Sequence, residues 1–285
     1  MRDSRRVKGP RHLKWWWALL LLGVVGCVEY LFFVRLRPGQ WADEAAFLAW
    51  VNWWPRTGLD SPVRAFLDLL PAMCAVIAVL FLIYRVIRDR SFVRAAVASL
   101  AAVAAVGSTQ LLKHFVLERP DFNFGTAMNS FPSGHTTTAA AAMGLMYVIS
   151  PPRLRPVVGP FAWGFATITG LATLISGWHR PSDIAAGFVM AGWWMVIGCA
   201  ILQARQPLAA KVKSTAWSRR AGLLALLAWA AVIALSWLLP HPHIKQIPDP
   251  LLVLYAGLGI AHIVASALLS GLCLRSVVLG PARRR

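Results

Sequence analysis

Long apolar runs alternate with short polar gaps over most of this chain. A helix needs about 20 predominantly apolar residues to cross a lipid bilayer. Eight runs match or approach that length, at about 15–34, 63–86, 92–113, 132–149, 157–176, 184–202, 223–239 and 251–273. We therefore predict an all-α, polytopic membrane helix bundle with about eight transmembrane helices. The alternating pattern of a transmembrane β-barrel is absent from the sequence.

The polar gaps predict how this bundle is oriented. Lysine and arginine gather in the gaps at 1–14, 85–94, 153–155 and 205–222 and in the last residues of the chain. Loops rich in these residues stay in the cytoplasm. With an even number of spans, we expect both termini to be cytoplasmic and the alternate segments, including 35–61 and 114–134, to lie outside the cell membrane.

The outer segment 35–61 carries a helical signal of its own. Residues 41–44 read as the start of a capped helix, and Phe47, Trp50 and Trp54 recur at helical spacing. This pattern is typical of a short amphipathic helix that lies in the interface with its apolar side toward the lipid. Such a helix would be either a simple anchor or a lid at the entry to a site.

Composition narrows the choice of partners. The chain is 58% hydrophobic and 14% charged, with a formal net charge of +18 and a mean hydropathy of +0.60. A nucleic-acid-binding surface would gather its cations on one face or stripe. Here the cations punctuate the apolar runs, so we expect membrane lipids as partners and no nucleic acid. The four cysteines lie far apart inside apolar runs, which predicts neither a disulfide framework nor a zinc site.

Three polar clusters interrupt the apolar pattern, all at predicted outer ends of the spans. They are Lys113–Pro120, Phe131–Thr136 and Trp178–Asp183. Ionisable residues are costly at such positions and usually serve a function. Together the clusters offer what the hydrolysis of a phosphate ester requires: cations for the oxygens, a nucleophile or base, and an acid for the leaving group.

The first two clusters fit an anion site. Lys113 and Arg119 supply positive charge, and an arginine can grip two oxygens at once. The sequence from Pro132 to His135 directly precedes an alanine-rich helix, whose first backbone N–H groups favour an anion. Gly134 lets the backbone come close to a ligand. We expect Ser133 to cap the helix, to bond the phosphate, or to do both.

The third cluster supplies an acid–histidine pair. His179 and Asp183 are four residues apart, and Pro181 is a residue favoured at a helix start. That spacing would bring the carboxylate beside the imidazole and fix its tautomer. With His135 as the second imidazole, one histidine would attack phosphorus and the other would protonate the departing oxygen. Each feature alone also fits a snorkelling anchor or a histidine at a wet surface, so the combination on one side of the membrane carries the prediction.

In this order, the clusters resemble the signature of the type 2 phosphatidic acid phosphatase superfamily, which shares its site with vanadium haloperoxidases. The family pattern is Lys-x6-Arg-Pro, then Pro-Ser-Gly-His, then Ser-Arg-x5-His-x3-Asp. Residues 132–135 match the second motif in full, and residues 179–183 match the end of the third. The likeness spans roughly residues 60–204 and implies a six-helix phosphatase-like core followed by two extra C-terminal spans.

The resemblance also implies roles for these residues. His179 would be the nucleophile that forms a phosphohistidine, Asp183 would orient it, and His135 would be the general acid. The phosphate would be held by Lys113, Arg119, Ser133 and the Gly134 amide. No metal or other cofactor is expected. The substrate would be a lipid phosphate or diphosphate, such as phosphatidate, phosphatidylglycerol phosphate or polyprenyl diphosphate.

Two positions depart from the family pattern. Only five residues separate Lys113 from Arg119, one fewer than usual, and the family's Ser-Arg positions hold Ala172 and Thr173. Arg180, beside the predicted nucleophile, either replaces the missing arginine as a phosphate ligand or faces lipid headgroups. Three hypotheses therefore stay open: a lipid phosphatase, a phosphoryl or head-group transferase with the same site, and a non-catalytic lipid-phosphate binder or transporter.

The predicted domain organisation follows from these features. It comprises a basic cytoplasmic tail 1–14, a six-span domain 15–204, a basic cytoplasmic loop 205–222 and two extra spans with a basic tail 223–285. The sequence does not predict the oligomeric state. Glu29 is expected to be hydrated or bonded to a neighbouring helix, and His262 to hydrogen-bond another helix. The pair His241 and His243 lacks a nearby third ligand, so we do not expect it to bind a metal.

Overall fold

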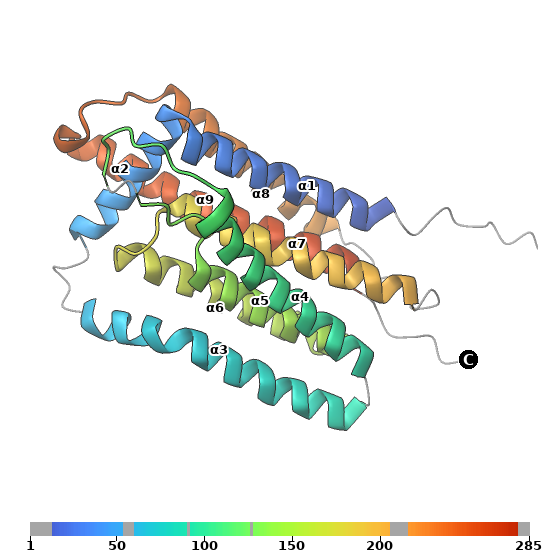
Figure 1. The fold of residues 1–285 in the computed structure, drawn as a ribbon. Helices are drawn as coiled ribbons and strands as arrows, with labels where there is room; N and C mark the ends of the chain where they lie inside the picture. The colour runs from blue at the N-terminus through green and yellow to red at the C-terminus, as the bar shows by residue number, and fades with distance from the viewer. Residues whose placement is uncertain (1–12, 54–59, 90–91, 126–127, 206–215, 279–285) are drawn as a thin grey trace, which may run out of the picture.

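The computed structural model describes residues 13–53, 60–89, 92–125, 128–205 and 216–278, which form a bundle of long helices (Figure 1). The predicted basic tail up to residue 12, residues 206–215 of the basic loop and the final residues 279–285 lie outside the described residues. The sequence predictions for those segments therefore stay predictions.

Within the described residues the secondary structure is entirely helical. The elements are α1 (Leu13–Glu29), the π-helical turn η1 (Tyr30–Arg35), α2 (Arg37–Trp53), α3 (Asp60–Asp89), α4 (Phe92–Leu111), the π-helical turn η3 (Leu112–Val116), α5 (Gly134–Ile149), α6 (Arg155–Ile175), α7 (Pro181–Arg205), α8 (Ala216–Leu238), the 3-10 turn η4 (Ile244–Gln246) and α9 (Asp249–Val277). Seven helices in this part of the chain are long and apolar enough to cross a membrane. The predicted all-α membrane bundle is confirmed. The fourth predicted span is the shorter helix α5, with 16 residues.

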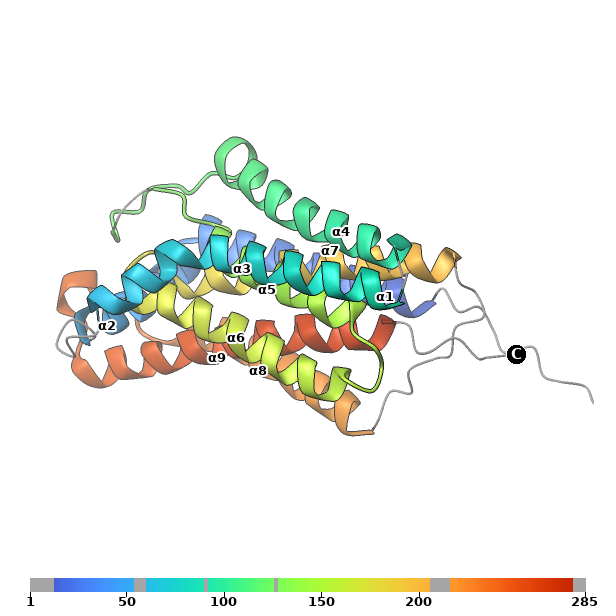
Figure 2. The same ribbon diagram turned by 90° about the horizontal axis from the view of Figure 1, so that it is seen from below.

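All the connections that carry the predicted site lie at one end of the bundle. Figures 1 and 2 show α2, the segment between α4 and α5, and the connection from α8 to α9 at this end. The start of α1 and the end of α9 lie at the opposite end. The sequence clusters that are far apart along the chain therefore meet at one end of the bundle.

Helix α7 forms the centre of the bundle and packs against α1, α4, α5 and α9. Many large apolar side chains point outward instead, among them Leu80 and Ile87 on α3 and Leu100 and Val103 on α4, each more than 60% exposed. A soluble monomer rarely exposes so much apolar surface. Together with the seven long apolar helices, this surface identifies a multi-pass membrane protein.

Hydrogen bonds hold both ends of α5. At its start, the Ser133 hydroxyl accepts a hydrogen bond from the Thr136 N–H at 3.3 Å and so caps the helix. At its end, the Nε atoms of Arg85 and Arg155 donate to the carbonyls of Ile149 and Ser150, each at 3.1 Å. Cations are stabilising at the carbonyl end of a helix. These contacts fix the position of α5 along the bundle axis.

The extra hairpin of α8 and α9 is joined to α1 by a buried polar contact. One Glu29 oxygen accepts hydrogen bonds from Trp229 Nε1 at 2.6 Å and from His262 Nε2 at 2.7 Å. The side chains of Glu29 and His262 are both at most 2% exposed. The expectation that His262 bonds another helix is confirmed, and of the two alternatives for Glu29 the structure shows the bond to a neighbouring helix.

Helix α2 differs from the predicted interfacial helix. It begins at Arg37, earlier than the expected start near residue 41, and packs against α9. Its acidic residues Asp43 and Glu44 are buried, with 2% and 4% exposure. A carboxylate can be buried when it is hydrogen-bonded. Asp43 accepts a hydrogen bond from Ser182, and Glu44 accepts one from Arg180, both at the start of α7. The apolar pattern of α2 alone gave no sign of these partners.

Candidate active site

A tight turn between α6 and α7 presents His179. Gly177 has φ +72°, a left-handed conformation that glycine adopts without steric cost. The backbone N–H groups of Trp178 and His179 both donate to the Thr173 carbonyl, at 3.0 and 3.3 Å. Pro181 then begins α7. The imidazole of His179 is thereby held just before the first turn of the central helix, with the whole residue 5% exposed.

Asp183, in the first turn of α7, is the centre of a buried hydrogen-bond cluster. Its carboxylate accepts hydrogen bonds from Ser130 Oγ at 2.5 Å, Arg180 N at 3.0 Å and Arg119 Nη2 at 3.3 Å. Nδ1 of His179 lies 3.7 Å from Asp183 Oδ2. That distance is too long for a hydrogen bond but close enough for the carboxylate to stabilise an imidazolium. His179 and Asp183 are therefore neighbours, as expected, but they are not joined by a hydrogen bond.

His135, in the first turn of α5, lies beside this cluster. Its ring centroid is 6.0 Å from that of His179 and 5.1 Å from the Trp178 ring. The Ser133 N–H donates to the Asp183 carbonyl at 2.8 Å, which ties the start of α5 to the start of α7. Gly187 permits this close approach, because a Cβ there would lie 2.9 Å from Thr136 Cβ. The two histidines are thus brought together by helix packing.

The predicted cations differ in their surroundings. Arg119 is buried, and its Nε and Nη1 atoms have no hydrogen-bond partner among the described residues. Buried donors without partners are rare in native proteins. Lys113 lies in η3 and is half-buried. It is close enough to His135 for its charge to act on the imidazole. Arg119 therefore keeps two donors open beside Asp183 and the histidines.

Ser133 and Gly134 lie at the amino end of α5, as the sequence predicted. The Ser133 oxygen accepts from the Thr136 N–H and hydroxyl, so its capping role is present in the structure. A Cβ on Gly134 would lie 2.8 Å from Gln110 Nε2 of α4. A larger residue would therefore displace the Gln110 amide, which had no signal in the sequence motifs.

Arg180 is held at the edge of the cluster by α2. Its Nε donates to Glu44 Oε2 at 2.5 Å, its Nη1 to Ser130 Oγ at 3.3 Å, and its guanidinium lies 5.6 Å from the Phe47 ring centre. Burial lowers the pKa of Arg180, but the charges of Glu44, Asp183 and Asp43 and the hydrogen bond to Glu44 together outweigh it, so the pKa is raised overall. The arginine is a fixed cation next to Asp183.

At residue 173, where the family pattern has an arginine, this chain has a threonine, which supplies no positive charge. Thr173 is buried, and its hydroxyl donates to the Gly170 carbonyl at 2.7 Å within α6. Its backbone carbonyl is already used by the turn that presents His179. Residue 173 therefore contributes to the shape of this turn, and the charge next to it comes from Arg180.

Asp43 and Ser130 complete the surroundings of the cluster. Asp43 accepts hydrogen bonds from Ser182 N at 2.9 Å and Ser182 Oγ at 2.6 Å. Burial, and then the charge of Asp183, raise the pKa of Asp43 to about 6. Neither Asp43 nor Ser130 belongs to the motifs that led to the site. Their only sequence signal was the presence of polar residues in otherwise aromatic or apolar outer segments.

The helix bundle and the cluster of histidines, arginines and carboxylates at one end define a membrane protein of the phosphatase type. Comparison with known proteins agrees with this class. The PAP2 superfamily profile matches residues 13–208. The chain belongs to the PAP2 superfamily, and the predicted resemblance is confirmed. The profile ends before α8, so the helices α8 and α9 lie outside the part shared with the family.

Individual relatives match over shorter stretches. The chain is 31% identical over 96 residues to a lipid A 1-phosphatase of Rhizobium etli, covering 34% of this chain and 39% of the relative. It is 30% identical over 96 residues to one of Rhizobium johnstonii, covering 34% and 37%. For one of Porphyromonas gingivalis, the identity is 34% over 83 residues, covering 27% and 18%. The chain thus spans less than half the length of these curated relatives. No solved structure shows significant similarity to the chain.

Proposed function

We propose that this protein is an integral membrane phosphatase of lipid phosphates or diphosphates, with His179 as nucleophile and no requirement for a metal. The observation that carries the proposal is the open coordination of Arg119 beside two histidines. Two buried guanidinium nitrogens have no partner among the described residues, and Asp183 joins Arg119 to the His179 turn. A phosphoryl group between the two imidazoles would supply the missing acceptors.

In the first step, Nε2 of His179 attacks phosphorus, a P–N bond forms, and the P–O bond to the lipid breaks. Nδ1 of His179 faces the Asp183 carboxylate, which stabilises the positive charge that develops on the ring. His135, on the neighbouring helix, gives its proton to the departing oxygen. Arg119, Lys113, Ser133 and the Gly134 N–H balance the charge on the phosphoryl oxygens.

In the second step, water replaces His179 on phosphorus. The His135 imidazole, now neutral, takes a proton from the attacking water, the new P–O bond forms, and the P–N bond breaks. Inorganic phosphate leaves and both histidines return to their starting states. Arg180 takes part as a cation held in place by Glu44, so its contribution to phosphate binding is electrostatic.

The proposal places the site outside the cytoplasm. The basic gaps of the sequence favour the end of the bundle with the start of α1 and the end of α9 as the cytoplasmic end, and the connections that carry the site residues lie at the other end (Figure 1). The relatives are named lipid A 1-phosphatases, which supports a lipid phosphate as substrate. We therefore include lipid A with phosphatidate, phosphatidylglycerol phosphate and polyprenyl diphosphate as candidates.

A phosphate-release assay with the purified full-length protein tests this function. We expect release from at least one of these four lipids in the presence of EDTA. In His179→Ala the rate should fall about 10⁴-fold or more, because the nucleophile is removed. Brief incubation with a ³²P-labelled lipid should leave acid-labile label on the wild-type protein and none on the variant.

His114→Ala is the matched control, because His114 is an exposed imidazole next to Lys113. It should retain both the activity and the label. Inactivity of the chelated wild type on all four lipids would overturn the proposed function. If label from the donor lipid appears instead in a second lipid, the same site is a transferase. If His179→Ala supports the cellular function fully, the protein is a non-catalytic binder.

A further inference from the structure

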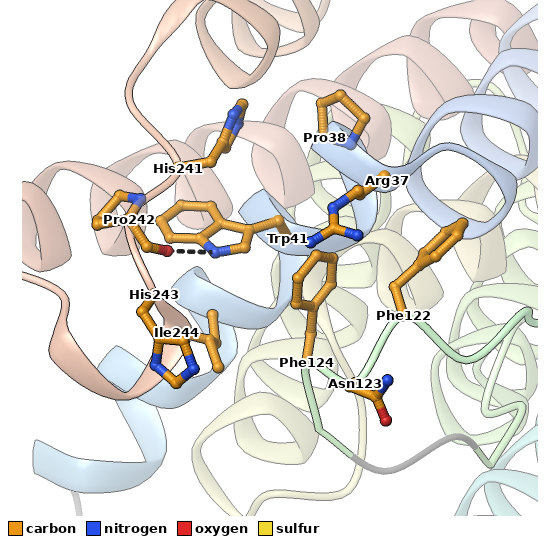
Figure 3. A pocket seen from close by; sticks show the side chains of 10 residues that line it. All are labelled: Arg37, Pro38, Trp41, Phe122, Asn123, Phe124, His241, Pro242, His243 and Ile244. Carbon is orange, nitrogen blue, oxygen red and sulfur yellow. Dashed lines mark hydrogen bonds between the residues drawn. The ribbon is translucent and has the colours of Figure 1, made fainter.

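A pocket separate from the candidate active site lies at the same end of the bundle. It has a volume of about 540 Å³, within the range of small-molecule sites. Its principal walls are Arg37, Trp41, Phe122, Phe124, His241 and His243 (Figure 3). The pocket is far larger than a single phosphate ion requires, and none of the groups in the proposed mechanism lines it.

Three segments that are distant in sequence build this pocket. Arg37 and Trp41 come from the first turns of α2, the two phenylalanines from the segment before α5, and the two histidines from the connection between α8 and α9. Trp41 Nε1 donates to the Pro242 carbonyl at 3.0 Å, so α2 and this connection are joined (Figure 3). Four of the ten residues that line the pocket therefore come from the part of the chain outside the PAP2 match.

The polar groups of the pocket offer both donors and acceptors. Nε2 of His241 bonds the Ser236 carbonyl at 2.9 Å, which makes Nε2 the protonated nitrogen and leaves Nδ1 as an acceptor. Nδ1 of His243 accepts from the Lys245 N–H, so its Nε2 is a donor. Hydroxyl groups both donate and accept. The two imidazoles are therefore suited to a ligand with several hydroxyls.

The remaining walls indicate a ring with an acidic substituent. The Arg37 guanidinium lies 5.2 Å from the centre of the Phe124 ring, beside the Trp41 indole (Figure 3). No carboxylate is among the described residues that line the pocket. Arginine binds phosphate or carboxylate through two parallel hydrogen bonds, and the partly exposed Phe122 and Phe124 side chains provide flat apolar surfaces for the faces of a sugar ring.

Two separations along the chain show that the pocket is close to the predicted phosphate-binding residues. Arg119 and Phe122 are three residues apart, so their Cα atoms are within roughly 11 Å of each other. Arg37 precedes Glu44, the partner of Arg180, by seven residues of one helix, a rise of about 10 Å. A head group of one or two sugar rings is long enough to reach from one position to the other.

We propose that this pocket binds the saccharide part of the substrate's head group, with an acidic substituent of the sugar at Arg37. This inference rests on the proposed function and narrows its substrate class to phosphorylated glycolipids. The hairpin of α8 and α9 then contributes to specificity, which gives a role to the part of the chain that the family does not share.

The first test compares two lipid phosphates, lipid A with its saccharide head group and phosphatidate without one. The measured quantity is the ratio of kcat/KM for lipid A to kcat/KM for phosphatidate. We expect this ratio to fall about 10-fold or more in Arg37→Gln, which loses a charge-assisted contact. Lys245→Gln, which removes a cation from the same connection without altering the pocket lining, should leave the ratio unchanged. An unchanged ratio in Arg37→Gln would overturn the inference.

The second test does not depend on catalysis. Binding of glucosamine 6-phosphate is measured by calorimetry on the Arg119→Ala protein, in which the proposed phosphate site is weakened. We expect binding there, and at least 10-fold weaker binding when Arg37→Gln is added. Absence of binding, or binding that Arg37→Gln does not change, would overturn the proposal that this pocket binds a saccharide. Inactivity on all lipids with this binding intact would instead overturn only the proposed function.

Discussion

Two buried pairs of a carboxylate with a histidine occur among the described residues, and they differ in whether the two side chains are hydrogen-bonded to each other. Glu29 and His262, between α1 and α9, are joined at 2.7 Å, and Trp229 donates to the same oxygen. Asp183 and His179 are 3.7 Å apart, and Nδ1 of His179 has no hydrogen-bond partner among the described residues. In the first pair, which we call closed, the two side chains are hydrogen-bonded to each other, although Oε2 of Glu29 has no partner among the described residues. In the second pair, which we call open, they are not hydrogen-bonded to each other.

The difference follows from what surrounds each pair. The ring of His262 packs 4.5 Å from the Phe33 ring, and the contact joins three helices. Around Asp183, in contrast, Arg119 and Ser130 of the connection before α5 meet Arg180 of the turn before α7, and Arg119 keeps two unused donors. A closed pair of this kind stabilises the fold. An open pair with unused donors is a site that a ligand can complete.

Among variants that keep the nucleophile His179, the largest effect is expected at His135, the proposed general acid. His135→Gln should lower kcat for phosphatidate by about 10²- to 10⁴-fold, because the alkoxide then leaves without a proton. For p-nitrophenyl phosphate, whose leaving group needs no proton, the loss should be much smaller. Steady-state assays with both substrates measure this difference. An equal loss on both substrates would contradict the role of His135 as general acid.

A somewhat smaller effect is expected at Arg119. Arg119→Ala should lower kcat by about 10²- to 10³-fold, because it removes charge-assisted contacts to the transferring phosphoryl group. Arg180→Gln is the comparison, since Nε of Arg180 is already bonded to Glu44. We expect a smaller loss there. If Arg180→Gln were the more damaging change in phosphate-release kinetics, Arg180 would be the principal replacement for the missing family arginine.

At the closed pair, the effect should appear in stability. His262→Ala leaves the buried Glu29 carboxylate without its cationic partner, which typically costs about 3–5 kcal/mol. The midpoint of thermal unfolding in detergent should fall, while kcat of the folded protein stays near the wild-type value. His262→Gln, which keeps a donor, should lose less. A large loss of kcat without a change in the unfolding midpoint would mean that the two pairs are not separate in function.

The smallest effect concerns Asp43, whose pKa is raised from its ordinary 3.8 to about 6 by burial and by Asp183. Between these values the folded protein holds a proton on Asp43 that the unfolded chain releases, so stability should fall as pH rises from about 4 to 6. The difference in unfolding midpoint between the wild type and Asp43→Asn should therefore decrease over that range and level off above it. Asp249→Asn, at an exposed carboxylate, is the control. An increase with pH would contradict the raised pKa.

The fold was largely predictable from hydrophobic length. Each apolar run became one helix, and the eight predicted spans correspond to α1 and α3–α9. His262 was expected to bond another helix, and Glu29 either to be hydrated or to bond a neighbouring helix, because an ionisable group inside a span is costly without a partner. What the sequence did not reveal was that they bond each other, since a pattern along one helix says nothing about the face it turns to another.

The candidate site was predicted in part. The motif residues His135, His179, Asp183 and Arg119 meet at one end of the bundle because two helix starts, α5 and α7, lie side by side. Asp43, Glu44 and Ser130 were missed, because their contacts cross between segments that share no spacing rule. Helix α2 looked like a surface helix for the same reason.

The hydrogen bond from the Ser133 N–H to the Asp183 carbonyl links the two helix starts through main-chain atoms alone. No side-chain replacement that preserves both backbones can remove it. Mutation can therefore change the chemistry of each helix start while the spacing between them is retained, and variants of these residues can be compared on a constant geometric frame.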